Sequence, residues 1–194
     1  MITDGPIVGS AFKSVLSQSY TDTSFLLYIE KRRNLHPNPF LNRLKMISVA
    51  RNEVRKMVLA TDCEFVWWVD SDTTPKENAL ELLMKSGKDV TCGWYLGADG
   101  SGSWTCGWIK HGLVSYPNDV HEGLLSVDFC GLGCSLMSRK SLEDIEFDCP
   151  ETYDFSQDGD KLLTSDATFW TKKANSLGYG VYMHGGVVCD HKTR

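Results

Sequence analysis

The chain has 194 residues, 42% of them hydrophobic, and a formal net charge of −5. This length suits one domain with a hydrophobic core, and the lack of any block of Lys and Arg argues against nucleic acid as a partner, because phosphate binding needs a basic face. No apolar run approaches the length of a membrane span, so we expect none. The seven cysteines are scattered through apolar segments, which predicts reduced core thiols and a cytoplasmic location.

Apolar patterning in the first half of the chain predicts helices and strands in alternation. We expect a helix over 7–16, a strand over 24–29, a loop over 34–40, a helix over 50–60, a strand over 64–69, a helix after Pro75 and a strand over 89–94. The 64–69 segment is almost wholly apolar, which is typical of a strand covered on both faces.

The second half predicts more strands and one further helix. We expect a hairpin over 104–115, two strand pieces within 126–138, a loop over 153–161, a helix that Ser165 caps and Gly178 ends, and a last strand over 179–189. Ala167, Trp170, Ala174 and Leu177 would face the core from that helix. The whole pattern favours a single α/β domain with a mainly parallel central sheet, flanking helices and a mixed second half.

The strongest chemical signal is Asp70-Ser71-Asp72, directly after the apolar strand at 64–69. Open α/β sheets bind ligands at the carboxyl ends of their strands. In extended chain, residues two apart point the same way, so both carboxylates would face one hard divalent cation, which prefers oxygen ligands. Such an ion can bridge a diphosphate. The alternative interpretation is that these acids solvate a turn.

Further motifs follow in the order found in one enzyme family. After Ala50-Arg51-Asn52 and the Asp70 motif come a glycine-containing pair of strands over 129–140, Ser165-Asp166 before an aromatic, and a final strand ending at His191. With these motifs the chain resembles the GT-A-fold, Asp-x-Asp-type nucleotide-sugar glycosyltransferases. It is similar to compact, family-2-like forms that occur in bacteria, phages and large algal viruses. For a viral protein the expected location is the host cytoplasm.

The resemblance implies a fold, a domain organisation and a reaction. The fold would be one GT-A-like (Rossmann-like) domain over 1–194, with a nucleotide-binding half over 1–95 and an acceptor and donor-sugar half over 96–194. The reaction would move a sugar from a nucleotide-sugar donor, most often UDP-linked in such families, to a glycan or glycoprotein hydroxyl. The cofactor would be Mn²⁺ or Mg²⁺, and an imidazole ligand favours manganese.

The resemblance also implies roles for individual residues. Asp72 and His191 would bind the metal, Asp70 would bind the metal or the ribose, and Asp166 would be the general base that deprotonates the acceptor. The residues expected to contact the donor are Thr3, Asp4, Glu30 and Arg51 on the nucleotide side and Asp128 and Gly131 on the sugar side. For two of these residues a structural role is an equal alternative: Arg51 as a salt-bridged helix residue and His191 as a surface histidine. For Asp166 we favour the site role over the alternative, in which it only complements the helix dipole.

Aromatic residues gather after the strand over 89–94. Trp94, Tyr95, Trp104 and Trp108 either stack on sugar rings or fill the core. Trp94 is the residue we expect to contact substrate. Trp67 and Trp68, within the apolar strand, are expected in the core.

Two other functions fit parts of the sequence. Asp70-Ser71-Asp72-Thr73-Thr74 also matches the nucleophile loop of haloacid-dehalogenase-type phosphatases, in which Asp70 would attack a phosphate and Asp158 and Asp160 would hold magnesium. That motif normally follows the first strand, whereas two strands are expected here before it. A non-catalytic domain that binds carbohydrate or nucleotide is the second alternative.

Overall fold

The computed structural model describes residues 2–3, 9–19, 28–29, 35–97, 102–111, 113–150, 153–154, 161–162 and 165–192. The helices are α1 (Gly9–Leu16), α2 (Pro39–Leu59), α3 (Ala79–Lys85), α4 (Arg139–Asp144) and α5 (Asp166–Ser176). The strands are β1 (Ile2–Thr3), β2 (Tyr28–Ile29), β3 (Phe65–Val69), β4 (Thr73–Thr74), β5 (Val90–Trp94), β6 (Cys106–Lys110), β7 (Leu113–Ser115), β8 (Leu124–Ser126), β9 (Phe129–Cys130), β10 (Cys134–Ser138), β11 (Tyr153–Asp154), β12 (Lys161–Leu162), β13 (Tyr182–Val188) and β14 (Asp190–His191). None of the helices in these residues is both long and apolar enough to cross a membrane.

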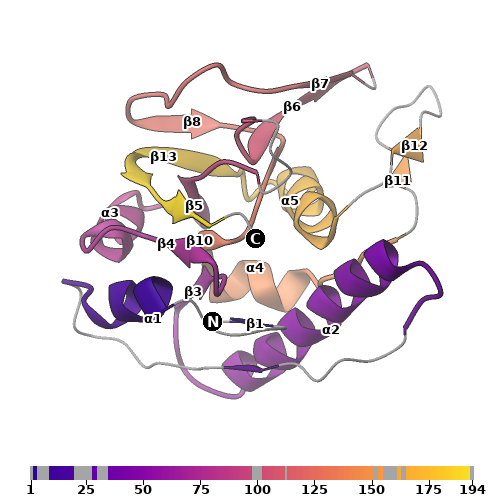
Figure 1. The fold of residues 1–194 in the computed structure, drawn as a ribbon, viewed down its shortest axis with the longest axis horizontal. Coiled ribbons are helices and arrows are strands. Elements are labelled where there is room, and N and C mark those ends of the chain that lie inside the picture. The colour runs from indigo at the N-terminus through magenta and orange to yellow at the C-terminus, as the bar shows by residue number, and fades with distance from the viewer. Residues whose placement is uncertain are drawn as a thin grey trace.

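A five-stranded mixed sheet in the order β3-β10-β5-β13-β8 forms the centre of the molecule (Figure 1). Within it β5 and β13 are parallel, and every other neighbouring pair is antiparallel. Smaller sheets join β7, β6 and β9, and pair β14 with β4. The prediction of a mainly parallel, GT-A-like or Rossmann-like sheet is therefore wrong.

The physical reason lies in β10. The apolar run of β3, followed by α3 and then β5, indicates two parallel neighbours joined by a crossover helix. The two strands do run in the same direction, but β10 arrives much later in the chain and inserts between them, antiparallel to both. An apolar run carries no information about which strand lies next to it. Nor is β3 covered throughout: it is an edge strand in which Trp68 and Val69 are buried and the three residues before them are partly buried.

Each face of the central sheet carries its own hydrophobic cluster. On one face α4 packs against β10, and α2 packs against α4 and α5; this cluster includes Met137 and Trp170. On the other face α3 contacts β5, β10 and β13, and the cluster includes Leu83 and Leu136. Leu136 and Met137 enter opposite clusters because successive side chains of a strand point to opposite faces.

Most of the expected elements are present. The strands expected at 64–69, 89–94 and 179–189 are confirmed as β3, β5 and β13, the hairpin at 104–115 as β6 and β7, and the strand pieces within 126–138 as β9 and β10. The helices expected over 7–16 and after Pro75 are confirmed as α1 and α3. Only Tyr28–Ile29 of the strand expected over 24–29 lies within the described residues, and it forms β2.

The helices differ from the prediction in three places. α2 begins at Pro39, well before residue 50, because the Asn38 side chain accepts the Leu41 N–H at 3.3 Å and proline is favoured in the first turn. α4 was not predicted. In α5 the Ser165 cap is confirmed, since its hydroxyl accepts the Thr168 N–H at 3.1 Å, but Leu177 is 52% exposed rather than facing the core.

One edge of the central sheet collects the ends of four strands. β3, β5 and β13 run in the same direction, so their carboxyl ends meet at this edge, where antiparallel β10 begins. Asp70 follows β3, Tyr95 follows β5, and Cys189 leads from β13 to His191. Mixed pairing thus still gathers the chemically interesting residues at the carboxyl ends of the parallel strands.

Candidate functional site

The Asp70-Ser71-Asp72 segment forms a turn at this edge. The Thr73 N–H donates to the Asp70 carbonyl at 3.1 Å, and the Asp70 N–H donates to the Gly133 carbonyl at 2.9 Å. The extended chain that we expected here is thus replaced by a turn, and the two carboxylates meet different partners. The side chain of Asp70 is 37% exposed and that of Asp72 is 17% exposed.

His191 is the partner of Asp72. Strand β14 pairs with β4 so that His191 lies opposite Thr73, and the Lys192 N–H donates to the Asp72 carbonyl at 3.0 Å. The imidazole Nε2 lies 3.5 Å from Asp72 Oδ1. These backbone pairings, made by residues far apart in the sequence, bring the carboxylate and the imidazole together.

A second contact fixes the orientation of the imidazole. His191 Nδ1 lies 2.8 Å from the Leu96 carbonyl oxygen. Because a carbonyl only accepts, Nδ1 carries the proton, and Nε2 faces Asp72 either as a second N–H or as a lone pair. The hydrogen bond with Asp72 is the main cause that raises the pKa of His191, against the opposing effect of burial.

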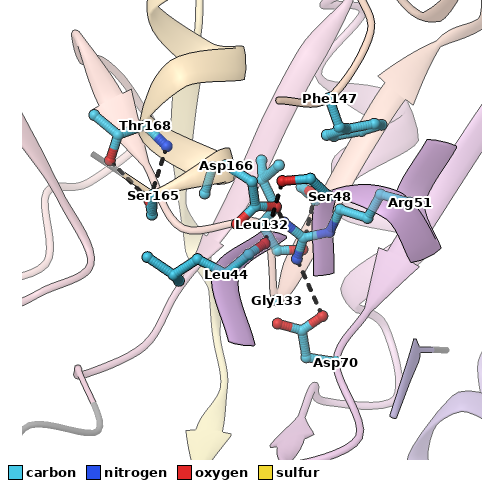
Figure 2. A network of polar contacts seen from close by, with 12 residues as sticks. Leu44, Ser48, Arg51, Asp70, Leu132, Gly133, Phe147, Ser165, Asp166 and Thr168 are labelled. Carbon is cyan, nitrogen blue, oxygen red and sulfur yellow. Dashed lines mark hydrogen bonds and ion pairs between the residues drawn. The ribbon is translucent and has the colours of Figure 1, made fainter. Parts of the chain in front are cut away.

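Arg51 lies on α2 and connects two carboxylates (Figure 2). Nη1 donates to Asp166 Oδ2 in a close contact, and Nη2 donates to Asp70 Oδ1 at 3.3 Å. The residue is only 3% exposed, and its guanidinium lies 5.9 Å from the centre of the Phe147 ring. Burial alone would lower the pKa of Arg51, but the Asp166 and Asp70 carboxylates outweigh it and raise the pKa.

Asp166 is the first residue of α5 and is 3% exposed. Burial raises the pKa of its carboxyl, and the Arg51 guanidinium opposes that shift without cancelling it. In this structure the carboxylate faces Arg51 and is closed to solvent. Asp166 therefore joins the site through its contact with Arg51, and its carboxylate is not open to an acceptor in this structure.

Tyr95 is a central residue of the site to which we gave no such role. It is 6% exposed, and its hydroxyl accepts the Gly133 N–H at 2.7 Å. Its ring packs edge-on against the His191 ring, with 5.2 Å between ring centres. A side chain on Gly131 would place its Cβ 2.2 Å from the Tyr95 hydroxyl oxygen, so a packing contact explains that glycine. The sequence signal was its position immediately after β5.

Several residues predicted to bind the donor have structural roles. Trp94 is 0% exposed and packs edge-on against Trp104, so neither face of its ring is open to a sugar. The Asp128 carboxylate accepts the Ile109 N–H at 2.7 Å. Trp68, as expected, lies in the core at 4% exposed.

The remaining predicted residues lie at the N-terminal side or outside the described chain. Thr3 is in β1, which runs parallel to β2. Asp4, Glu30, Asp158 and Asp160 lie outside the described residues. The structure therefore brings together Arg51, Asp70, Asp72, Asp166 and His191 from the predicted set.

The donor atoms suit a divalent cation in kind. Within the described residues no three His, Cys, Asp or Glu side chains form a closed metal cage. Mg²⁺ and Mn²⁺ sites for phosphates need fewer protein ligands, since one or two carboxylates, waters and the phosphates complete the shell. The 3.5 Å between Asp72 Oδ1 and His191 Nε2 is near the roughly 3 Å expected between adjacent ligands with bonds of about 2.1 Å.

Comparison with known proteins gives a match in structure and none in sequence. No family model and no curated protein matches the chain. Among solved structures, the crystal structure of A197 from STIV is similar, with a TM-score of 0.65 and 19% sequence identity over 100% of this chain and 83% of that chain. The likeness is one of fold. At this identity it carries no activity from A197 to this chain.

Proposed function

We propose that the chain is a metal-dependent glycosyltransferase that moves a sugar from a UDP-linked nucleotide-sugar donor to a hydroxyl of a glycan or glycoprotein. The observation that carries the proposal is the pairing of Asp72 with His191, next to Asp70, at the carboxyl ends of β3, β5 and β13. Such an edge is where α/β sheets bind nucleotides. Two carboxylates and an oriented imidazole make it suited to a metal-bound diphosphate.

Each residue has a distinct part in this proposal. Asp72 and His191 would hold Mn²⁺ or Mg²⁺, and the contact of His191 Nδ1 with the Leu96 carbonyl keeps Nε2 directed at the site. Asp70, the most exposed of the three acids that take part, would bind the metal or the ribose. The metal, when bound, would neutralise charge on the departing diphosphate.

The acceptor side of the reaction requires a base. As the sugar leaves the diphosphate oxygen, its anomeric carbon bonds to the acceptor oxygen, and the acceptor proton passes to a base. Asp166 stays our predicted base on the resemblance alone, because its carboxylate is enclosed with Arg51. In that role the carboxylate would have to leave Arg51 when substrate binds.

We propose a cytoplasmic location for the protein. The burial of six of the seven cysteines is compatible with the reducing cytoplasm, or the host cytoplasm for a viral protein. A phosphatase, or a non-catalytic domain that binds carbohydrate or nucleotide, would use the same edge of the sheet. Release of a nucleoside diphosphate from a nucleotide sugar distinguishes a transferase from both.

The test is release of nucleoside diphosphate. The protein is incubated with a panel of nucleotide sugars and Mn²⁺, with and without glycan acceptors, and UDP is measured. We expect UDP release that requires the metal and is lost in Asp72→Asn. Asp62→Asn, an exposed acid on the loop before β3, is the matched control and should keep full activity. Metal-dependent nucleotide binding with no release from any donor would favour the binding domain instead.

A further inference from the structure

We infer that Arg51 is a positioning residue that holds the Asp70 carboxylate in place for the metal and nucleotide, and that Asp166 acts by holding Arg51. The inference deepens the proposed function and rests on it. In this inference two buried side chains, those of Arg51 and Asp166, support the more exposed carboxylate of Asp70.

Figure 2 shows the two carboxylates on either side of the Arg51 guanidinium, and their exposure differs. At the inner end the side chains of Asp166 and Arg51 are each 4% exposed, and at the outer end that of Asp70 is 37% exposed. Arg51 donates a hydrogen bond from one terminal nitrogen to each carboxylate. The guanidinium is planar and presents its donors in a fixed fork, so anchoring one end at Asp166 sets the direction of the other.

The contacts of Arg51 leave it little freedom for another task. Both terminal nitrogens are engaged with carboxylates, and Nε is buried with no hydrogen-bond partner in the described structure. A donor phosphate would have to displace these contacts to reach Arg51, so the predicted role of Arg51 as a direct contact to the donor suits the structure less well. By contrast, a hydrogen bond to Asp70 Oδ1 leaves Oδ2 available to a ligand.

Asp166 also has a positioning role, which it exerts through Arg51. A buried charge without a partner is strongly destabilising, and the Asp166 carboxylate supplies that partner for the buried guanidinium. Arg51 would otherwise be left with Asp70, its looser and more exposed partner at 3.3 Å. Asp166 therefore fixes which way Arg51 points, whether or not it also takes a proton.

The first test measures Mn²⁺ binding without any substrate, by titration of the free-ion electron paramagnetic resonance signal. Residues that orient metal ligands typically change metal affinity 10–100-fold when altered. We expect Arg51→Lys, which keeps the charge but loses the fork, to weaken Mn²⁺ binding by about 10-fold or more. Asp166→Asn keeps a hydrogen-bond acceptor for Arg51 and should have a smaller effect.

Arg55→Lys is the matched control. Arg55 lies one turn further along α2, is 9% exposed, and donates to the Leu142 and Glu143 carbonyls at the end of α4, away from the site. It should lose comparable stability and keep the wild-type Mn²⁺ affinity. A double variant, Arg51→Met with Asp166→Leu, removes both buried charges and so guards against unfolding; it should bind Mn²⁺ about as weakly as Arg51→Lys.

The outcomes separate the inference from the proposed function. Folded Arg51 variants that bind Mn²⁺ as tightly as wild type, or an equal loss in Arg55→Lys, would overturn the positioning role. If wild type binds Mn²⁺ and the Arg51 variants do not, while no nucleotide sugar is turned over, the positioning role stands and the transferase fails. Absence of Mn²⁺ binding by wild type overturns both.

Discussion

His191 faces Asp72 across the pairing of β14 with β4, with Nε2 3.5 Å from Oδ1 and Nδ1 held by the Leu96 carbonyl. The two residues lie far apart in the sequence. They meet because β14, which contains His191, pairs with β4, which directly follows the turn that contains Asp72. A carboxylate and an imidazole at this separation hold either a proton or a cation between them. The first two predictions test for a cation between the two side chains, and the third tests for a proton.

The first prediction concerns nucleotide binding. UDP should raise the melting temperature of the protein in the presence of Mn²⁺ or Mg²⁺ and not in excess EDTA, because only binding to the folded state adds stability. At a nucleotide concentration 100 times its Kd, the gain is about 2.7 kcal/mol. Differential scanning fluorimetry measures the shift. An equal shift with EDTA would mean that no metal bridges the diphosphate.

The second prediction concerns His191 itself. His191→Ala should weaken metal-dependent nucleotide binding while the protein stays folded. His121→Ala, which changes an exposed histidine, should behave as wild type, since surface substitutions change the free energy of unfolding by about 0.5 kcal/mol or less. Calorimetric titration of Mn²⁺ and UDP into both variants is the measurement. The same metal dependence in both would leave His191 with no part in binding.

The third prediction is a pH dependence of the metal-free protein. Asp72 raises the pKa of His191 in the folded state above its unfolded value of about 6.5. The extra stability is therefore fully present below pH about 6.5 and is lost as the pH rises through the folded pKa. Urea unfolding of wild type and His191→Gln in EDTA, from pH 5.5 to 9, should show a stability difference that shrinks as pH rises. A difference that does not vary with pH would contradict an ion pair with Asp72.

The sequence allowed part of the site to be predicted, for physical reasons that differ between residues. Asp70 and Asp72 follow an apolar strand, and a strand end is readable from local pattern alone. His191 and Asp166 depended on a resemblance, because the contacts that bring them in are long-range. Tyr95 had a signal only in its position after β5, and the Leu96 carbonyl, as a backbone atom, leaves no pattern in the sequence. Trp94 was misjudged because its apolar neighbours suit a stacking face and a core equally well.

The fold shows the same division. The predicted boundaries of helices and strands lie close to the observed ones wherever a cap or an apolar run marks them, as at Ser165 and β3. The direction and order of the strands did not, since the insertion of β10 between β3 and β5 is decided by packing over most of the chain. Local periodicity specifies an element and one buried face, and strand neighbours are set by the tertiary structure.

The fourth prediction tests the packing of Tyr95 against the glycines. Gly131→Ala should destabilise the protein by about 1–3 kcal/mol, because the new Cβ would lie 2.2 Å from the Tyr95 hydroxyl oxygen. Tyr95→Phe removes that oxygen, so the double variant should lose less than the sum of the two single variants. Chemical unfolding of the four proteins gives the coupling. Strict additivity would mean that Gly131 and Tyr95 do not press on each other.

The fifth prediction decides between sugar transfer and phosphatase chemistry, because the two functions give Asp70, Asp72 and Asp166 different tasks. For a transferase, Asp72→Asn should abolish metal-dependent donor binding and with it all turnover. Asp166→Asn should slow transfer in either of its roles, by about 10²–10⁴-fold if the carboxylate is the base. For a phosphatase, Asp70 is the nucleophile and Asp166 has no chemical part.

UDP release from nucleotide sugars is measured beside hydrolysis of a phosphate monoester, for wild type, Asp70→Asn, Asp72→Asn and Asp166→Asn. We expect UDP release alone, with the monoester left intact by every protein. The Mn²⁺ affinity of Asp166→Asn then tests whether Asp166 holds Arg51. If Asp166 is a base alone, the affinity is unchanged; if it holds Arg51, with or without acting as the base, the affinity falls. Monoester hydrolysis that Asp70→Asn abolishes and Asp166→Asn leaves at full rate, without any turnover of nucleotide sugar, would make the chain a phosphatase.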